Sequence, residues 1–175
     1  MKQKNTCNYD KRILGEYEIF SELTEDQIDK FCKVIIPIRF MKGDTIIREG
    51  EKGNSILLLL DGKVDITQAL TLKTDTTQSD TREKSLLSLS SETHPFFGEM
   101  SLFSENDLRT ATVKAGTVCS VARIERGEFF HICNTYPEIG NKVMRNIAQV
   151  LSRRLKQANQ NVLKLTTAFS LIIES

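Results

Sequence analysis

Short apolar segments, separated by glycine, proline and polar residues, follow one another over residues 34–124. Within several of them, branched and aromatic side chains alternate with polar ones, which is the period of a β-strand. The pattern predicts strands over residues 34–40, 45–49, 55–60, 63–67, 86–89, 110–115 and 118–124. Short strands with turn residues about every 8 to 12 positions are typical of a compact β-barrel or β-sandwich.

Two of the connections between these strands have distinctive compositions. Asp61-Gly62 lies between two predicted strands and is a strong signal for a two-residue hairpin turn. Residues 68–84 are rich in threonine, serine, aspartate and glutamine, and they offer few groups that need burial. We therefore expect residues 68–84 to form a long, mobile hairpin loop at the surface.

Helical periodicity lies on either side of the predicted strands. Thr24 and Gln27 have the spacing of a capping box, which predicts a helix over about 25–33. A short helix is expected over residues 128–133. Pro37 marks an edge strand, but Pro137 has the position of a proline in the first turn of a longer helix.

An apolar seam continues along this last helix for about four heptads. Its members repeat at intervals of four and three residues: Met144, Ala148, Leu151, Leu155, Ala158, Val162, Leu165, Phe169 and Ile172. One interpretation is an amphipathic helix that lies on its own domain, as its first two turns would. A helix that reaches residue 170 would extend past a small barrel, so we expect two chains to pair in parallel through residues 144–172.

The composition fits one domain with a hydrophobic core, because the chain has 175 residues and is 39% hydrophobic. The net charge of +1 provides no strong field for nucleic acid. Residues 1–13 are polar, which predicts a frayed terminus without a secretory signal. No apolar run approaches the roughly 18 residues of a membrane span. The four cysteines form no CxxC pair, so we expect buried, reduced thiols in a cytoplasmic protein.

The segment 97–103, followed by Arg109, carries the candidate chemistry. Gly98 allows a close approach of the backbone, and the start of a short helix at Glu99 offers unpaired amide groups to an anion. A guanidinium such as that of Arg109 binds two phosphate oxygens through its planar fork. A carboxylate such as that of Glu99 accepts hydrogen bonds from sugar hydroxyls. The alternative is an ordinary Gly-Glu pair and a solvated surface arginine.

Several motifs resemble the cyclic nucleotide-binding domain family, which includes the catabolite activator protein, kinase regulatory subunits and nucleotide-gated channels. They occur in the family's order over about residues 17–160. The matching segments are Phe40 to Gly50, Gly53 to Ile56, Leu60 to Val64, Phe97 to Leu102, Arg109 to Thr112, Tyr136 to Ile139 and Arg153 to Leu155. The resemblance implies a mainly β fold with flanking helices, namely the family's β-roll or jelly roll, followed by a long C-terminal helix.

The resemblance also implies roles for particular residues. Arg109 would pair with the cyclic phosphate, and Glu99 would bind the ribose 2′-hydroxyl. Four further residues would surround the ligand's oxygen atoms: Gly98, Met100, Ser101 and Thr110. The helix near Asn159 would meet the base, although Ala158-Asn159 stands where the activators have Thr-Ser, which leaves the preference between cAMP and cGMP open. Ser101 replaces the usual alanine or glycine.

We therefore expect a β-roll ligand-binding domain over residues 1–136 and a dimerisation helix over 137–175. The 175 residues contain no helix-turn-helix, so we expect a stand-alone regulatory module that has no direct DNA binding and acts through an unknown protein partner. An alternative is a structural or interaction dimer that has lost nucleotide binding. A metal-dependent barrel enzyme would need several histidines, and only His94 and His131 are present. We expect no enzyme, metal site or cofactor apart from the nucleotide ligand.

Overall fold

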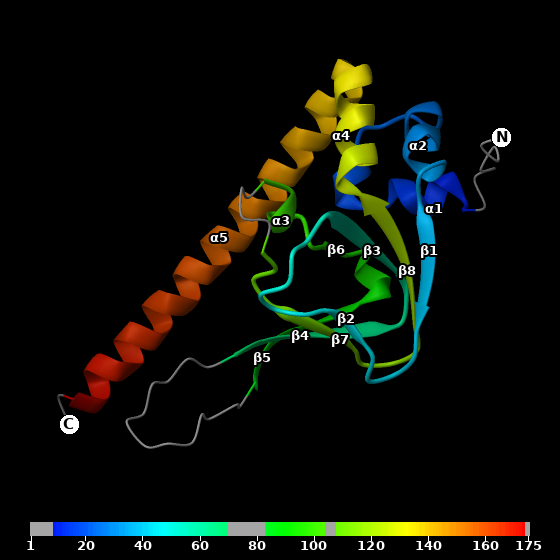
Figure 1. Ribbon diagram of the computed structural model, residues 1–175. Coiled ribbons are helices and arrows are strands. Elements are labelled where there is room, and N and C mark those ends of the chain that lie inside the picture. Colours follow the sequence, from blue (N-terminus) through cyan, green and yellow to red (C-terminus); the bar gives the residue numbers. More distant parts are fainter. Residues whose placement is uncertain (1–8, 70–82, 104–107, 174–175) are drawn as a thin grey trace.

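The computed structural model describes residues 9–69, 83–103 and 108–173 (Figure 1). Its strands form two antiparallel four-stranded sheets that face each other. The first sheet has the order β1 (Ile36–Phe40), β8 (Cys119–Glu125), β3 (Ser55–Asp61) and β6 (Phe96–Phe97). The second has the order β2 (Thr45–Ile47), β7 (Thr112–Ala115), β4 (Lys63–Ala69) and β5 (Glu83–Ser90). This architecture confirms the predicted mainly β class.

The hydrophobic core has two parts because β3 is buried on both faces. Leu57 and Leu59 pack between the two sheets, whereas Ile56 and Leu58 contact the helices on the other side of the first sheet. Successive strand residues point to opposite faces, which explains why β3 is apolar without interruption. The helices of this layer are α1 (Lys11–Gly15), α2 (Glu25–Cys32), α4 (Arg126–Thr135) and the first half of α5 (Pro137–Ile173), together with the 3₁₀ turn η1 (Glu18–Phe20).

The predicted capping box is confirmed at the start of α2. The amide of Gln27 donates to the Thr24 hydroxyl, and the amide of Thr24 donates to the Gln27 side chain. The expectation of a frayed terminus over residues 1–13 is wrong for its last part, because α1 begins at Lys11 with Asp10 as its cap. Residues 1–8 lie outside the described residues.

The prediction of a hairpin turn at Asp61-Gly62 is wrong. The chain does reverse there, but β3 and β4 belong to different sheets and are not partners. Gly62 has a φ of +93°, and a side chain at this position would collide with the carbonyl oxygen of Val118. Glycine is therefore needed here because the chain passes close to Val118 as it crosses from one sheet to the other. A hairpin turn favours glycine as well, so the residue type does not distinguish the two structures.

The β4–β5 pair is a hairpin, but its strands are longer than the predicted loop over 68–84 allows. Gln68 pairs with Lys84 and Ala69 with Glu83. Residues 70–82, for which mobility was predicted, lie outside the described residues. The residues at this end of the two strands are mostly polar and show no apolar alternation. The sequence pattern therefore predicted strands that end too early.

The expectation of reduced thiols is only partly met. Cys32 is disulfide-bonded, so the expectation of a reduced thiol is wrong at this position. Cys119 and Cys133 are free and buried as predicted. Burial raises the pKa of the Cys133 thiol to about 11, which keeps the thiol protonated near neutral pH. Cys7 lies outside the described residues.

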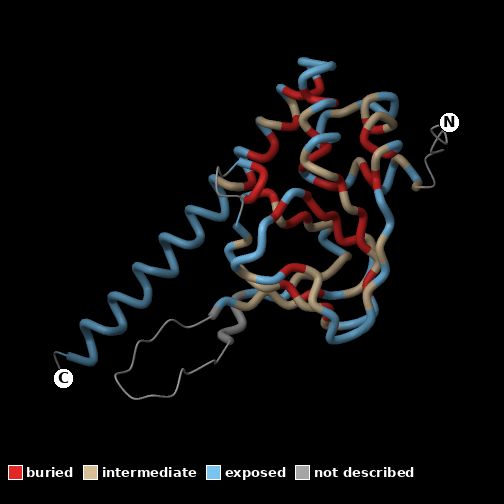
Figure 2. The backbone as a smooth tube through the Cα atoms, in the orientation of Figure 1, coloured by how far each residue is buried: buried red, intermediate tan, exposed pale blue. Residues whose placement is uncertain are grey.

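Helix α5 is one continuous helix of 37 residues, as the sequence pattern predicted, but its two halves have different surroundings (Figure 2). The first half is buried through Ile139, Val143, Ile147 and Val150. Asn146 adds two polar contacts by donating to the backbone oxygens of the η1 region. From residue 152 onwards every described residue of α5 is exposed, including the seam residues after Leu151.

Candidate ligand-binding site

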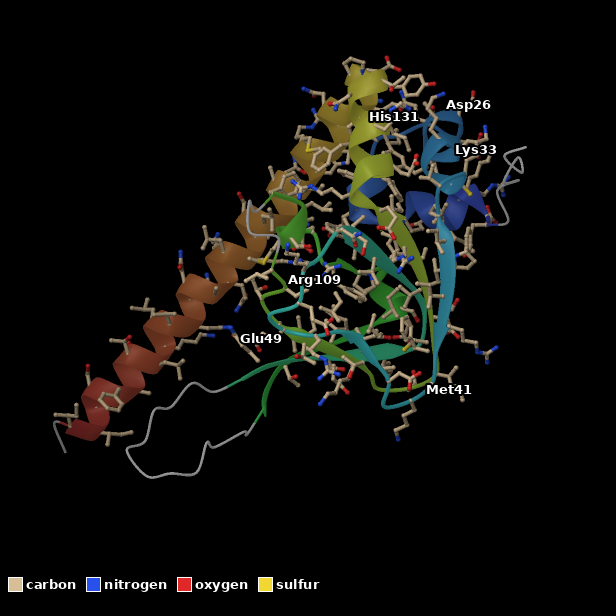
Figure 3. All side chains as sticks on the ribbon, in the orientation of Figure 1. Asp26, Lys33, Met41, Glu49, Arg109 and His131 are labelled. Carbon is tan, nitrogen blue, oxygen red and sulfur yellow. The ribbon has the colours of Figure 1, made fainter. Side chains whose placement is uncertain are left out.

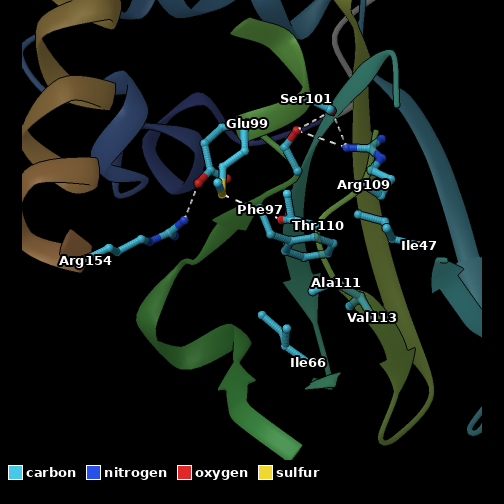
Figure 4. A pocket seen from close by; sticks show the side chains of 12 residues that line it. Ile47, Ile66, Phe97, Glu99, Ser101, Arg109, Thr110, Ala111, Val113 and Arg154 are labelled. Atoms are coloured by element: carbon cyan, nitrogen blue, oxygen red, sulfur yellow. Dashed lines mark hydrogen bonds and ion pairs between the residues drawn. The ribbon is translucent and has the colours of Figure 1, made fainter. Parts of the chain in front are cut away.

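A cavity of about 220 Å³ lies between the sheets, near the exposed half of α5 (Figure 4). Its wall contains every predicted site residue except Asn159. The lining residues are Ile47, Ile66, Phe97, Gly98, Glu99, Met100, Ser101, Arg109, Thr110, Ala111, Val113 and Arg154. The cavity has two polar ends, which we call the Arg109 end and the Glu99 end.

At the Arg109 end, the guanidinium is already held in a fixed position (Figures 3 and 4). Its Nη1 donates to the backbone oxygens of Ser55 and Gly98, both at 3.0 Å, and to the Ser101 hydroxyl at 2.8 Å. Its Nη2 donates to the Ser55 hydroxyl at 3.1 Å. An arginine has five N–H donors, so the acceptors of three residues orient the group without using all of its donors.

Two glycines make room for Arg109. Gly98 has a φ of +82°, and a Cβ atom there would lie 2.5 Å from Arg109 Nη1. A Cβ atom on Gly53, in the loop between β2 and β3, would collide with Nε of the same guanidinium. Gly98 was predicted as a site residue because backbone approaches closely there. Gly53 was quoted only as part of a motif, and its contact with Arg109 could not be seen in the sequence.

The short helix α3 (Met100–Phe103) follows Glu99, as predicted. Ser101 on this helix is buried, and its hydroxyl donates to the Gly98 oxygen at 2.9 Å while accepting from Arg109. The serine that replaces the usual alanine or glycine therefore contacts Arg109 directly. Thr110 also lines the cavity, and its hydroxyl lies 3.8 Å from the Met100 sulfur.

Burial lowers the pKa of the Arg109 guanidinium, while the nearby carboxylates of Glu125 and Glu99 raise it. The guanidinium stays cationic at neutral pH, because arginine is not deprotonated in proteins. The Arg109 end is therefore a fixed positive charge in a partly desolvated wall, where an anion interacts more strongly than in bulk water.

At the Glu99 end, the carboxylate is almost fully buried, with an exposed fraction of 2%. Arg154 of α5 donates from Nη1 to Glu99 Oε1 at 2.5 Å and from Nη2 to the Phe96 backbone oxygen at 2.9 Å. The Arg154 guanidinium also lies over the Phe96 ring, 5.4 Å from its centroid. Because a buried carboxylate needs a partner, Arg154 belongs to the site as much as Glu99 does.

Arg154 was missed as a site residue from the sequence, although it lies in the Arg153 to Leu155 motif. Two adjacent arginines on a helix give no indication of which one reaches a carboxylate 55 positions earlier. Arg153 instead pairs with Glu18, where both side chains are largely exposed. A signal was available only in the requirement that Glu99, if buried, should have a cationic partner.

The wall between the two ends is apolar. It is formed by the side chains of Ile47, Ile66, Phe97, Ala111 and Val113. Such a wall suits a flat, weakly polar ring and supplies few hydrogen bonds to its edges. The site thus combines a fixed cation, a buried carboxylate and an apolar surface, as needed for a ligand with a phosphate, a hydroxyl-bearing sugar and a base.

Comparison with known proteins agrees with this geometry. The family model of the cyclic nucleotide-binding domain matches residues 37–136, which is more than half of the chain. The chain belongs to the cyclic nucleotide-binding domain family. It is 29% identical over 153 residues to the CRP-like cAMP-activated global transcriptional regulator of Mycobacterium tuberculosis, covering 87% of this chain and 62% of the relative. It is 31% identical over 134 residues to a cGMP-dependent protein kinase of Drosophila melanogaster, covering 74% of this chain and 13% of the kinase.

The catabolite activator protein of Thermus thermophilus has the same fold, with a TM-score of 0.71 and 23% identity over 85% of this chain and 63% of that chain. This likeness confirms the predicted β-roll. The domain is of a regulatory kind and is similar to those of activators and cyclic nucleotide-dependent kinases. The chain spans less than two thirds of the length of the curated relatives named above.

Asn159 does not reach the cavity of its own chain. It is exposed on α5 and borders a shallow groove together with Leu155 and Leu163. Its predicted contact with a base stays a prediction. Among the described residues no cluster of His, Cys, Asp and Glu has the arrangement of a metal site. In the same part of the chain, no helix has the length and apolar character to span a membrane.

Proposed function

We propose that this domain binds a cyclic nucleotide, cAMP or cGMP, in the cavity between Arg109 and Glu99 and thereby regulates a partner. The observation that carries the proposal is the position of these two residues in one cavity, with a fixed guanidinium at one end and a buried carboxylate at the other. The two relatives bear on the choice of nucleotide without deciding it, because one is named for cAMP and the other for cGMP.

In the proposed complex, the cyclic phosphate binds the Arg109 guanidinium, and the amides after Gly98 face the phosphate oxygens. Phosphate oxygens are stronger acceptors for a cation than a neutral hydroxyl, so the ligand replaces Ser101 as an acceptor of Arg109. The ribose 2′-hydroxyl donates to Glu99. The base lies against the apolar wall near Val113, and Thr110 stands at its edge.

The Glu99 end supplies the proposed regulation. A hydroxyl bound to Glu99 shares the carboxylate with Arg154, and Arg154 is part of α5. A ligand shifts a conformational equilibrium only by its different affinity for the two states. The Glu99–Arg154 ion pair is the contact through which that difference reaches α5, and this use of the domain is regulatory and not catalytic.

We further propose that α5 mediates a parallel homodimer. Its exposed half presents Leu155, Val162, Leu165, Phe169 and Ile172, each with more than 60% of its surface exposed. An apolar stripe of this length is unfavourable in water unless another surface covers it. A second copy places an identical seam opposite, and Asn159 would then lie between the two chains near the cavity.

Calorimetric titration of the purified protein with cAMP and with cGMP tests the binding proposal. We expect saturable binding of at least one nucleotide and a loss of about 10- to 150-fold in affinity for Arg109→Ala, which removes a charge-assisted contact. Arg39→Ala is the control, because Arg39 is exposed on β1. Absence of binding by the wild type at millimolar concentrations would support the alternative, a structural or interaction dimer without nucleotide.

Light scattering tests the dimer. We expect a dimer at tens of micromolar for the wild type and a monomer for the double variant Leu155→Asp/Val162→Asp, because both charges would be buried in the seam without partners. Lys156→Asp is a control on the same helix that changes charge outside the seam. A monomeric wild type, or a double variant that still dimerises, contradicts the proposed interface.

A further inference from the structure

A second cavity, of about 180 Å³, lies behind Arg109 and has a different character from the first. It is lined by residues of the first sheet, of β2 and of the loop that follows β2. The lining residues are Ile38, Phe40, Ile46, Ile47, Arg48, Glu51, Lys52, Asn54, Ser55, Leu57, Arg109 and Arg123. Arg109 and Ile47 are shared with the first cavity, so Arg109 is part of the wall between them.

The charges around this second cavity are unbalanced. Four cationic side chains line it, at positions 48, 52, 109 and 123, against a single lining carboxylate, that of Glu51. Glu125 adds one negative charge nearby, because its Oε1 lies 3.0 Å from Arg123 Nε. Glu51 Oε1 lies 3.4 Å from Arg48 Nε, and the Glu51 side chain is mostly exposed. Counting both carboxylates, the surroundings of the cavity keep an excess of positive charge.

Two polar groups in the wall have unused hydrogen-bonding capacity. Arg123 Nε is buried and forms an ion pair with Glu125 Oε1 at 3.0 Å, but it donates no aligned hydrogen bond. Ser55 is buried, and its hydroxyl accepts from Arg109 but donates to no described residue. A buried donor without an acceptor is unfavourable, and an anion with several oxygens satisfies such donors together.

We propose that the second cavity binds a small tetrahedral oxyanion of the phosphate class. The several cationic side chains in its lining match the multiple oxygens of such an anion. Arg123, Lys52 and the Ser55 hydroxyl provide its donors. The site is separate from the proposed nucleotide site, although Arg109 borders both.

The shared wall predicts a coupling between the two cavities. Two anions on either side of one guanidinium repel each other and divide its charge between them. Inorganic phosphate should therefore weaken cyclic nucleotide binding, and by linkage the nucleotide should weaken phosphate binding by the same factor. This coupling rests on the proposed function, whereas phosphate binding itself does not.

The test is a calorimetric titration of the full chain with inorganic phosphate at constant ionic strength. Arg123→Gln should weaken phosphate binding about tenfold or more, because a charge-assisted donor is lost. Lys52→Gln, on an exposed loop position, is a second variant that does not depend on the packing of β8. Arg39→Gln is the matched control, since it removes the same charge from the exposed side of β1.

The proposal is supported if both cavity variants lose phosphate affinity, the control keeps it, and nucleotide affinity in phosphate-free buffer is unchanged in all three. It is overturned if the wild type binds no phosphate at millimolar concentrations. It is also overturned if phosphate competes with nucleotide equally well in wild type and both variants, because the phosphate would then bind on the nucleotide side of Arg109. A protein that binds phosphate but no nucleotide would refute the proposed function and leave this site standing.

Discussion

Arg109 and Glu99 stand at the two polar ends of the same cavity, but different parts of the chain hold them. The acceptors of Arg109 come from Ser55, Gly98 and Ser101, which belong to the β-roll and its short helix. The partner of Glu99 is Arg154, which lies on the exposed part of α5, shortly after its last buried residue, Val150. One end is therefore built within the roll, whereas the other depends on where α5 lies.

This difference assigns different tasks to the two ends. The acceptors around Arg109 lie on the same body as Arg109, so a movement of α5 leaves them in place. The Glu99–Arg154 pair joins the roll to α5 and would be altered by the same movement. In a regulatory domain, the Arg109 end would supply affinity in every state, and the Glu99 end would report occupancy to the helix.

The largest expected effect comes from breaking the Arg109 end with Gly98→Ala. The new Cβ atom would lie 2.5 Å from Arg109 Nη1, in a backbone conformation that strains alanine. We expect nucleotide affinity to fall by about 10- to 150-fold, as for loss of the arginine contact, and stability to fall by about 1 kcal/mol or more. Calorimetric titration and thermal unfolding measure the two effects.

Gly43→Ala separates the two causes. Gly43 has a similar φ of +92°, but nothing lies within 4 Å of a Cβ atom at this position. We expect the control to lose stability and keep its nucleotide affinity. Equal losses of affinity in both variants would show that general destabilisation, and not displacement of Arg109, explains the result.

The sequence was informative about the Arg109 end because its parts are close in the chain or belong to a linear motif. Gly98, Ser101 and Arg109 lie within one segment, and a short helix after Glu99 follows from local pattern. Ser55 as an acceptor and Gly53 as a neighbour were not predicted. Ser55 lies on β3 and Gly53 in the loop before it, and the sheet topology brings both next to Arg109. The hydrophobic pattern does not predict that topology.

The Glu99 end and the pairing of the strands were predicted less completely, because both depend on contacts between segments that are far apart in the sequence. The 37-residue length of α5 was predictable from its period, but the rotation that turns Arg154 towards Glu99 depends on tertiary packing of Ile147 and Val150. Likewise, the turn residues Asp61-Gly62 were recognised correctly as a reversal and wrongly as a hairpin. A local turn signal predicts that the chain changes direction, but it does not predict which strand the following strand pairs with.

The second prediction concerns the Glu99 end and stability. Arg154→Gln leaves a carboxylate that is 2% exposed without its cation. Removing one partner of a fully buried pair costs roughly 3–5 kcal/mol, but the Arg154 side chain is 45% exposed, so we expect about 1–3 kcal/mol. Denaturant unfolding of this variant, of Glu99→Gln and of the double variant gives the coupling energy.

The double variant should recover part of the loss, because two neutral amides leave no unpaired buried charge. Strictly additive losses would contradict the ion pair as the contact between the roll and α5. Arg153→Gln is the matched control: its partner Glu18 is exposed, so we expect a loss below about 1 kcal/mol.

The smallest effect is expected for Ser101→Ala. This variant tests whether the Ser101 hydroxyl mainly positions Arg109 or mainly competes with the nucleotide phosphate for it. The Ser101 hydroxyl accepts from Arg109 Nη1 at 2.8 Å, the donor that the proposed phosphate contact uses. If the hydroxyl mainly competes, its removal frees the donor and nucleotide affinity rises; if it mainly positions the guanidinium, affinity falls. The Ser55 and Gly98 oxygens still hold Nη1 at 3.0 Å in this variant, so we expect the competition to dominate. Because Nη1 shares two protons among three acceptors, we expect the Ser101 contact to contribute only about 0.5–1.5 kcal/mol, which corresponds to a rise of roughly 2- to 12-fold in titration. A fall in affinity with unchanged stability would show instead that the Arg109 end depends on the serine for its geometry.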